Sequence, residues 1–359
     1  MAGRVLSPPS VEAPTAPASL PARRFESVRR LRELGILVAA VLMFVLLALA
    51  TPKFLTTTNA LNVARQISLL AIIACGMTYL FIAGELDLSV GSTYAACAIV
   101  FGFLLATLKL PVPLALMLVV GMGGLVGVVN GVLTTKGGIP SFIVTLGMMS
   151  AMRGATLFGS GGWPIPVNDA SVWTNLLGGN ILLAENKLSL IGTTLAVPPT
   201  TVQLMVPVHV LWMVLILALG GAVLAYSRFG YHVYATGGNR QAARLTGIDT
   251  DWVKIRAFII TGALVGLAAS LLVAWLHTAN PNTGLGFELD VIAAVIIGGT
   301  NLFGGVGSVL GTIVGAAITG MISNGLVLLG ASAYLEGIIK GMIIVGAVGL
   351  DIAIQRRQR

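Results

Sequence analysis

The sequence predicts an all-α fold: a polytopic membrane protein with about ten transmembrane helices, some of them broken or re-entrant. Three observations support this prediction. Hydrophobic residues make up 56% of the 359 positions and charged residues only 9%, whereas a soluble domain carries about 25% charged residues. Apolar runs recur along the chain at the length that crosses a hydrocarbon core, about 20 residues of helix. Lysines and arginines gather in particular loops between these runs.

Ten apolar runs are the candidate spans, with ends set by polar breaks. They cover Leu34–Ala50, Ile67–Ala83, Val90–Leu108, Val112–Leu133, Ile139–Phe158, Val206–Tyr226, Ile255–Leu276, Leu289–Gly299, Val309–Leu329 and Gly337–Ile354. The run that begins at Leu289 is too short to span unless it extends backwards or is broken. A discontinuous helix is therefore expected there.

The residues before the first run form a separate region. Residues 1–33 are rich in Pro, Ala, Ser and Arg without apolar periodicity, so a disordered cytoplasmic tail is expected, followed by a transmembrane domain over residues 34–355. The first run ends in Ala48-Leu49-Ala50, which resembles a signal-peptide cleavage site. Because a basic region of this length is long for a signal peptide, we interpret the run as an uncleaved first helix.

Positive charge predicts the orientation, because lysines and arginines near span ends are retained in the cytoplasm. With ten spans, the loops that carry most of them share one side, and both termini are expected to be cytoplasmic. The residues concerned are Arg23, Arg24, Arg29, Arg30, Arg32, Lys136, Arg228, Arg240, Arg244, Lys254, Arg256, Arg356, Arg357 and Arg359. The net charge of +8 is scattered over separate loops, which does not favour a nucleic-acid partner.

Two longer polar segments lie outside the apolar runs. Residues 159–205 are expected on the non-cytoplasmic side, where turn residues alternating with apolar patches favour an ordered lid or interfacial segment that receives a soluble partner; the alternative is a merely long connection. Residues 227–254 form a cytoplasmic loop whose polar, basic, helix-forming stretch 236–248 is typical of a docking element for a soluble partner. Its alternative is an ordinary solvated loop.

Glycine spacing predicts close helix packing. Two sets repeat every four residues, namely Gly123, Gly127 and Gly131, and Gly307, Gly311 and Gly315. Each set forms a smooth strip along one helix face, where backbones approach closely in a solvent that provides no hydrophobic drive. This packing role accounts for these glycines, and no chemistry is assigned to them.

Two glycine-rich segments, residues 83–92 and 298–308, interrupt apolar sequence with polar residues. Such breaks are tolerated only where protein or a water-filled cavity satisfies the backbone, so both are candidates for lining a pathway. Glu85 and Asp87 are either ion-coupling carboxylates or capping groups for the next helix. We favour capping, with Asp87 or Ser89 accepting from its free amides.

Enzyme signatures are missing from the sequence. It has no phosphate-binding loop and no His-Glu-x-x-His motif, and its three histidines are far apart. Catalytic residues, metal ligands and cofactors are therefore not assigned. Cys75 and Cys97 lie inside apolar runs and are interpreted as buried filler. Uphill transport would need an energy source outside this chain.

Several motifs, in order, resemble the ribose-type permease subunits of bacterial ATP-binding-cassette importers over residues 35 to 355. They are Gly84–Ser92, Asn130-Gly131, Pro140–Gly147, Arg153-Gly154, Phe229–Asn239, Ala242–Arg244, Gly247-Ile248, Gly298–Thr300 and Phe303–Ser308. Glu85 and Leu86 depart from the Gly and Ile that are common in the family. The departure at Glu85 adds a charge.

The resemblance implies a non-catalytic, multi-pass permease of the bacterial inner membrane that translocates a monosaccharide or related polyol. The expected partners are cytoplasmic ABC ATPase subunits, a periplasmic sugar-binding protein and a second permease subunit, in a homodimer or heterodimer. The resemblance also implies that the 227–254 loop holds a coupling helix, which Asn239 caps and which runs through Arg244. The ATPase-coupling residues are then Gly237, Gly238, Asn239, Ala242, Ala243, Arg244 and Gly247.

Polar residues at membrane depth are candidates for the translocation pathway or its gate. They are Glu85, Asp87, Ser89, Asn130, Ser141, Thr145, Asn301 and Asn324. For the uncharged groups, a helix–helix hydrogen bond is an equally good interpretation. The alternative function is an ion-coupled secondary transporter that uses Glu85, Asp87 or Arg153. A membrane enzyme would require a cluster of reactive residues that the sequence lacks.

Overall fold

A computed structural model describes residues 22–169, 171–184, 187–190, 193–196, 204–332, 335–342, 345–346 and 349. Twelve helices are bounded in it: α1 (Ala22–Ala50), α2 (Thr57–Ile82), α3 (Val90–Ala106), α4 (Val112–Thr135), α5 (Ser141–Ser160), α6 (Val172–Gly178), α7 (Val208–Tyr226), α8 (Arg228–Gly238), α9 (Arg240–Leu245), α10 (Thr250–Leu276), α11 (Phe287–Ile297) and α12 (Val309–Leu328). Residues 335–342 are also helical.

The predicted polytopic, mostly helical membrane fold is confirmed. Among the described residues, α2, α4, α5, α7, α10 and α12 are long and apolar enough to cross a membrane, and α3 and residues 35–50 of α1 are shorter apolar helices. The run expected to be broken is α11, which has only 11 residues. The tenth run begins in helical residues 335–342, and most of its remainder lies outside the described residues.

Two small antiparallel sheets are present that the expected all-α class did not include. One pairs β1 (Ile165–Pro166) with β6 (Thr278–Ala279). The other has the order β4-β3-β2-β5 and consists of β2 (Asn180–Ala184), β3 (Lys187–Leu190), β4 (Thr193–Ala196) and β5 (Leu204–Pro207). Apart from β6 and the last residues of β5, these strands fall in segment 159–205. Its short apolar patches between turn residues are too brief for helices and pair as strands.

The first helix begins at Ala22 and not at Leu34 as expected. The stretch from Arg23 to Glu33 contains neither Pro nor Gly and includes five Arg, two Glu and one Leu, which are good helix formers. It therefore continues the apolar helix toward the N-terminus. The disordered tail expected for residues 1–33 stays a prediction for residues 1–21, which lie outside the described residues.

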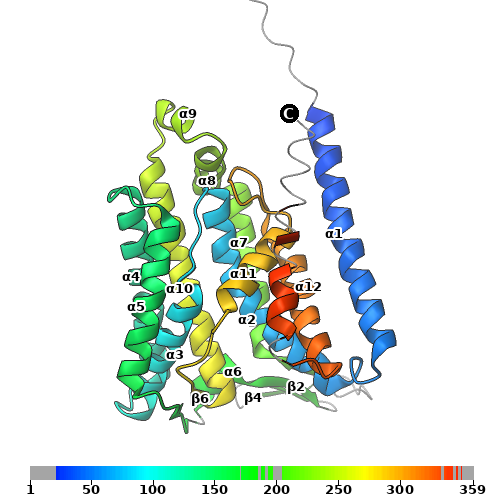
Figure 1. Cartoon of the computed structure of the whole chain (residues 1–359). Coiled ribbons are helices and arrows are strands. Elements are labelled where there is room, and N and C mark those ends of the chain that lie inside the picture. The colour runs from blue at the N-terminus through cyan, green and yellow to red at the C-terminus, as the bar shows by residue number, and fades with distance from the viewer. Residues whose placement is uncertain are drawn as a thin grey trace, which may run out of the picture.

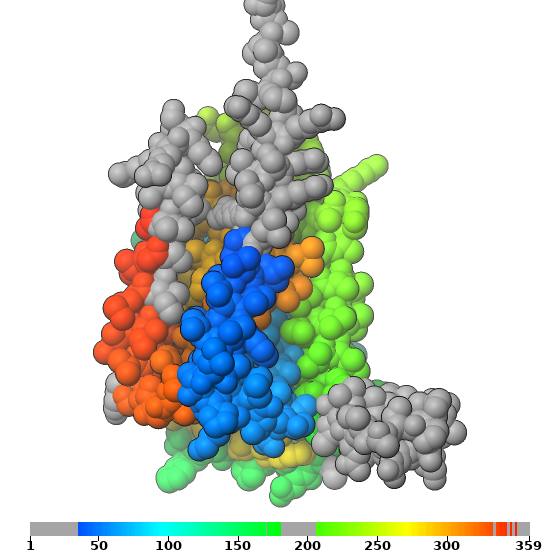
Figure 2. Space-filling model, turned by 90° about the vertical axis from the view of Figure 1, so that its right-hand side faces the viewer, coloured from blue at the N-terminus to red at the C-terminus, as the bar shows by residue number. Residues whose placement is uncertain are grey.

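The core of the bundle surrounds α2 and α10. Every residue of α2 from Ser68 to Ile82 is buried, and α10 packs against α4, α2 and α3. Figure 1 places α8 and α9 at one end of the bundle and the strands at the other. Helix α1 lies on the outside, between α7 and α12 (Figure 2), and exposes large apolar side chains such as Leu49, as expected of a surface in lipid.

The glycines of both strips lie at close contacts, but Gly307 precedes α12, which begins at Val309, so only Gly311 and Gly315 of the second strip share a helix as predicted. On α4, a Cβ at Gly123 or Gly127 would overlap the backbone of α10 at Gly262 or Phe258. On α12, a Cβ at Gly315 would overlap the carbonyl of Ala294 in α11. The backbones therefore approach too closely for any side chain.

Replacing Gly127 by Val is expected to destabilise the α4–α10 pair. Overpacking at such a contact costs about 1–3 kcal/mol, so the melting temperature in detergent should fall. Gly121→Ala on the same helix is the control, because no atom lies within 4 Å of the added methyl group. Equal melting temperatures for Gly127→Val and the unmodified protein would contradict the close packing.

Candidate coupling site and transport pathway

The polar loop expected over residues 227–254 folds as two helices and the start of α10. Ser227 separates α7 from α8, and its hydroxyl accepts a hydrogen bond from the amide of Gly230 at 3.0 Å. At the end of α8, Asn239 leaves the helical conformation with φ −156°. Its side chain accepts from the amide of Ala242 at 3.0 Å. The predicted short helix capped by Asn239 is therefore present as α9.

Helix α9 projects beyond the rest of the bundle (Figure 1) and is held against the start of α10. Arg240 and Arg244 both reach Asp251, with N–O distances of 2.8 and 2.6 Å. These pairs are solvent-exposed, so each is worth about 0–1 kcal/mol. Ala243 is buried, whereas Leu245 is 90% exposed. The basic helix α9 therefore ends in an apolar side chain, Leu245, that faces outward.

Behind α9, the end of α8 meets the two predicted breaks. A Cβ at Gly237 would overlap the carbonyl oxygen of Ile82, the last residue of α2. That carbonyl accepts a hydrogen bond from the amide of Gly305 at 2.9 Å, where φ is +77°. The hydroxyl of Tyr234 donates to the carbonyl of Gly307 at 2.7 Å. The end of α8, the end of α2 and segment 298–308 therefore form one packed junction.

Glu85, in the first break, forms an ion pair with Lys254, a residue that served above only as evidence for the membrane orientation. Lys254 on α10 donates to Glu85 Oε1 at 2.6 Å, and the two side chains are 7% and 11% exposed. A buried ion pair fixes two charges that would each be costly alone. Glu85 is thus neutralised in the structure, and it joins the first break to the helix that follows α9.

Asp87, Ser89 and Asn130 form a second buried cluster, in which Asp87 and not Ser89 accepts from a free amide at the start of α3. Asp87 Oδ1 accepts from the amide and the hydroxyl of Ser89 at 2.8 and 2.6 Å. Asn130 donates to Asp87 Oδ2 at 3.2 Å and to the Ser89 hydroxyl at 3.0 Å. Ser89 makes no side-chain cap for α3, since its own backbone is already helical. The cluster also ties the first break to α4 through Asn130.

The other pathway candidates form local or helix–helix bonds. Thr145 donates to the carbonyl of Ser141 at 2.8 Å within α5, and Asn301 accepts from the amide of Phe303 at 2.8 Å within its own turn. Asn324 on α12 and Asn59 on α2 exchange two amide hydrogen bonds, of 2.8 and 3.0 Å. The interpretation as a helix–helix bond therefore holds for Asn324.

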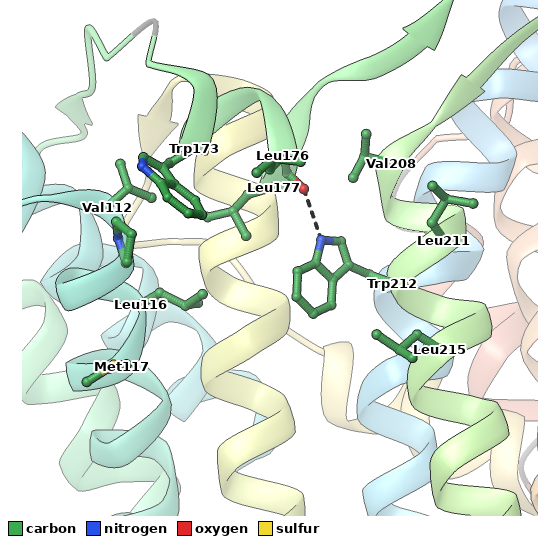
Figure 3. Close-up of a pocket in the computed structure, with 11 residues that line it drawn as sticks. Val112, Leu116, Met117, Trp173, Leu176, Leu177, Val208, Leu211, Trp212 and Leu215 are labelled. Carbon is green, nitrogen blue, oxygen red and sulfur yellow. Dashed lines mark hydrogen bonds between the residues drawn. The ribbon is translucent and has the colours of Figure 1, made fainter. Parts of the chain in front are cut away.

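Two cavities between the helices differ sharply in chemistry. The apolar cavity, of about 420 Å³, lies between α4, α6 and α7 and is lined by Leu, Val and Met side chains with Trp173 and Trp212 (Figure 3). The indole N–H of Trp212 already has a hydrogen-bond partner, because it donates to the carbonyl of Leu176 at 3.0 Å. Such a lining suits hydrocarbon and provides no hydrogen bonds for a polar solute.

The second, here the polar cavity, has a volume of about 340 Å³ and lies between α2, α3, α10, α11, α12 and residues 335–342. Its wall includes Gln66, Tyr94, Trp275, Phe287, Asp290 and Lys340. None of the eight predicted pathway residues lines it. Sequence reasoning missed Asp290 and Lys340, although a charge within an apolar run is itself a signal of function.

Comparison with known proteins decides the family. Residues 59–348 match the family described as branched-chain amino acid transport system / permease component. The chain belongs to this permease family. The matched region of the permease runs from the first turn of α2 past α12 and residues 335–342, and so contains the α8–α9 junction and both cavities.

Relatives resemble the permease over nearly their whole length. The ribose import permease protein RbsC of Escherichia coli K12 is 35% identical over 334 residues, which cover 92% of this chain and 96% of that protein. RbsC of Bacillus subtilis is 35% identical over 322 residues, 89% and 93% of the two chains. The xylose transport system permease protein XylH of Escherichia coli K12 is 31% identical over 362 residues, 90% and 92%. No solved structure matches the permease.

Proposed function

We propose that the chain is the membrane-spanning permease subunit of an ATP-binding-cassette importer that carries a monosaccharide or related polyol across the bacterial inner membrane. Its relatives are named for ribose import and xylose transport. The observation that carries the proposal is α9: a capped, projecting basic helix with an exposed apolar tip, connected through α8 to both helix breaks. Separate ATPase subunits supply the energy, and the permease itself is not an enzyme.

Mechanical coupling follows from the junction behind α9. ATP-driven closure of the partner ATPase moves α9, and the contacts of Gly237 and Tyr234 pass that motion to Ile82 and to segment 298–308. Because packed helices shift as rigid units, the bundle exchanges between inward- and outward-open states. The residues assigned to coupling are Gly237, Gly238, Asn239, Ala242, Ala243, Arg244 and Gly247.

The proposed orientation places α8, α9 and both termini in the cytoplasm. Segment 159–205 then lies on the periplasmic side, where a sugar-binding protein docks. A second permease subunit, identical or homologous, completes the pathway. The support is the distribution of positive charge together with the location of α9 and the strands at opposite ends of the bundle (Figure 1).

The ion-coupled alternative receives less support from the structure. Glu85 is paired with Lys254, Asp87 accepts three hydrogen bonds, and Arg153 donates to the carbonyls of Pro281 and Thr283. All three ionisable candidates therefore have structural partners.

Co-purification tests the proposal directly. Gentle extraction of the tagged protein from its native membrane should bring an ATP-binding-cassette ATPase with it, identified by mass spectrometry. A permease that emerges alone, yet drives uptake under an ion gradient in liposomes, would contradict the proposal.

Replacing residues 239–244 by a flexible linker is expected to abolish sugar uptake and uncouple ATP hydrolysis, because the capped helix is lost. The membrane portion should remain folded and elute as before in size-exclusion chromatography. Asn239→Ala removes only the cap, worth about 1 kcal/mol, and should give an intermediate defect. Unchanged uptake with the linker would refute the assignment of α9.

A further inference from the structure

The polar cavity lies in the half of the bundle nearer the strands. Its α2 residue Gln66 follows Arg65, which donates to Asn180 of β2 at 2.7 Å. Its α10 residue Trp275 lies in the last turn before β6. The cavity is therefore located near the proposed periplasmic side, where a solute released by a binding protein enters.

The walls combine apolar rings with hydrogen-bonding groups. Tyr94 and Phe287 stack with centroids 5.4 Å apart and, together with Trp275, supply flat apolar surface. Hydrogen-bonding groups come from the side chain of Gln66 and from the hydroxyls of Thr283, Thr319 and Ser323. A sugar presents apolar C–H faces and a rim of hydroxyls, so this mixture of walls matches it on both counts.

Charge in the cavity wall is unbalanced. Lys340 Nζ donates to Asp290 Oδ2 at 2.9 Å and lies 2.7 Å from Glu336 Oε1. Two carboxyl groups thus share one ammonium group, which leaves surplus acceptor capacity at a partly buried site. The hydroxyl groups of a sugar donate hydrogen bonds to such carboxylate oxygens without bringing further charge into the cavity. A metal cation is a poorer fit, because the ammonium of Lys340 already occupies the position between the two carboxylates.

We propose that the polar cavity is a transit site for a single monosaccharide, in which Asp290 and Glu336 accept hydrogen bonds from sugar hydroxyls beside the aromatic rings. The proposal deepens the proposed transport function and rests on it. The volume of about 340 Å³ is at the lower end of the range of about 300–1,000 Å³ for small-molecule pockets, which suits one sugar ring. A wall of partly satisfied groups binds weakly enough to release the solute.

A cysteine-protection experiment tests the site. Ser323→Cys places a thiol in the cavity wall of the full-length protein, while Cys75 and Cys97 are buried and the unmodified chain gives the background. In right-side-out membrane vesicles, a membrane-impermeant maleimide should label this thiol, and D-ribose or D-xylose should slow the labelling. Ser332→Cys, at an exposed position outside the cavity, should label equally fast with and without sugar.

Glu336→Gln supplies the matched variant, because it removes the surplus carboxylate and keeps the Lys340–Asp290 pair. In the Ser323→Cys background, it should raise the half-protecting sugar concentration by about tenfold, the effect of one lost charge-assisted hydrogen bond. An unchanged size-exclusion profile serves as the folding control.

Three outcomes would overturn the transit site: no labelling of Ser323→Cys, labelling that neither sugar slows, or a half-protecting sugar concentration that Glu336→Gln leaves unchanged. Protection by L-leucine in place of the sugars would overturn the ligand class. None of these results bears on whether an ATPase co-purifies, so failure of the transit site is distinguishable from failure of the proposed function.

Discussion

Gly237→Ala is expected to abolish uptake, whereas Gly238→Ala, at the next position, is expected to lower it far less. The methyl group at Gly237 would overlap the carbonyl oxygen of Ile82 and crowd the amide of Gly305 at 2.8 Å, while the methyl group at Gly238 meets no atom within 4 Å. Ala is normally the better helix former by about 1 kcal/mol. A loss at Gly237 must therefore come from contact with α2 and segment 298–308.

Two measurements on Gly237→Ala and Gly238→Ala distinguish a loss of transport from a loss of stability. Uptake of labelled sugar reports on transport, and the melting temperature in detergent reports on stability, which overpacking lowers by about 1–3 kcal/mol. If ATP hydrolysis by the assembled complex persists while uptake is lost, the junction transmits motion. Equal uptake by the two alanine variants would mean that the contact between α8 and α2 is dispensable.

Lys254→Met is expected to give the largest loss of stability among single substitutions at this end of the bundle. It leaves Glu85 in a site where the carboxylate side chain is only 11% exposed and its partner is gone. Removing one member of a buried pair costs about 3–5 kcal/mol. Little folded protein should be recovered, as judged by fluorescence-detected size-exclusion chromatography.

The double variant Glu85→Gln/Lys254→Met is the control for this prediction. Because replacing both members of a buried ion pair is often neutral, it should recover most of the folded protein lost in Lys254→Met. Uptake then tests ion coupling: a double variant that folds and transports excludes an essential carboxylate at Glu85. Failure of the double variant to recover would show that Lys254 contributes more than neutralisation of Glu85.

Local sequence predicted the features that local chemistry governs. The Asn239 cap depends on a side chain and an amide three residues apart, so it was predictable from the order of residues. The short α11 followed from the length of its apolar run. Asp87 or Ser89 was predicted to cap α3 by the same reasoning, and Asp87 accepts from the amide of Ser89. The Ser89 hydroxyl instead bonds to Asp87 and to Asn130, which comes from a different helix.

The pathway candidates show where such reasoning fails. Asn324 was a polar group at membrane depth, and only the packing of α12 against α2 placed Asn59 within hydrogen-bonding distance. The strands of segment 159–205 and the end of β5 form because backbone groups outside the spans must pair with one another. Asp290 and Lys340 were charges in separate apolar runs, and they became one site only when α11 met residues 335–342.

The sequence by itself determined that this protein spans a membrane, where most of its apolar helices lie, which glycines allow close packing and which motifs relate it to sugar permeases. Hydropathy and capping act within one helix, so their signals are local. Only the tertiary structure decided that Lys254 neutralises Glu85, 169 positions away, that Gly237 touches Ile82, and that six segments enclose the polar cavity. These contacts depend on how helices distant in sequence pack together, a property no short stretch of sequence contains.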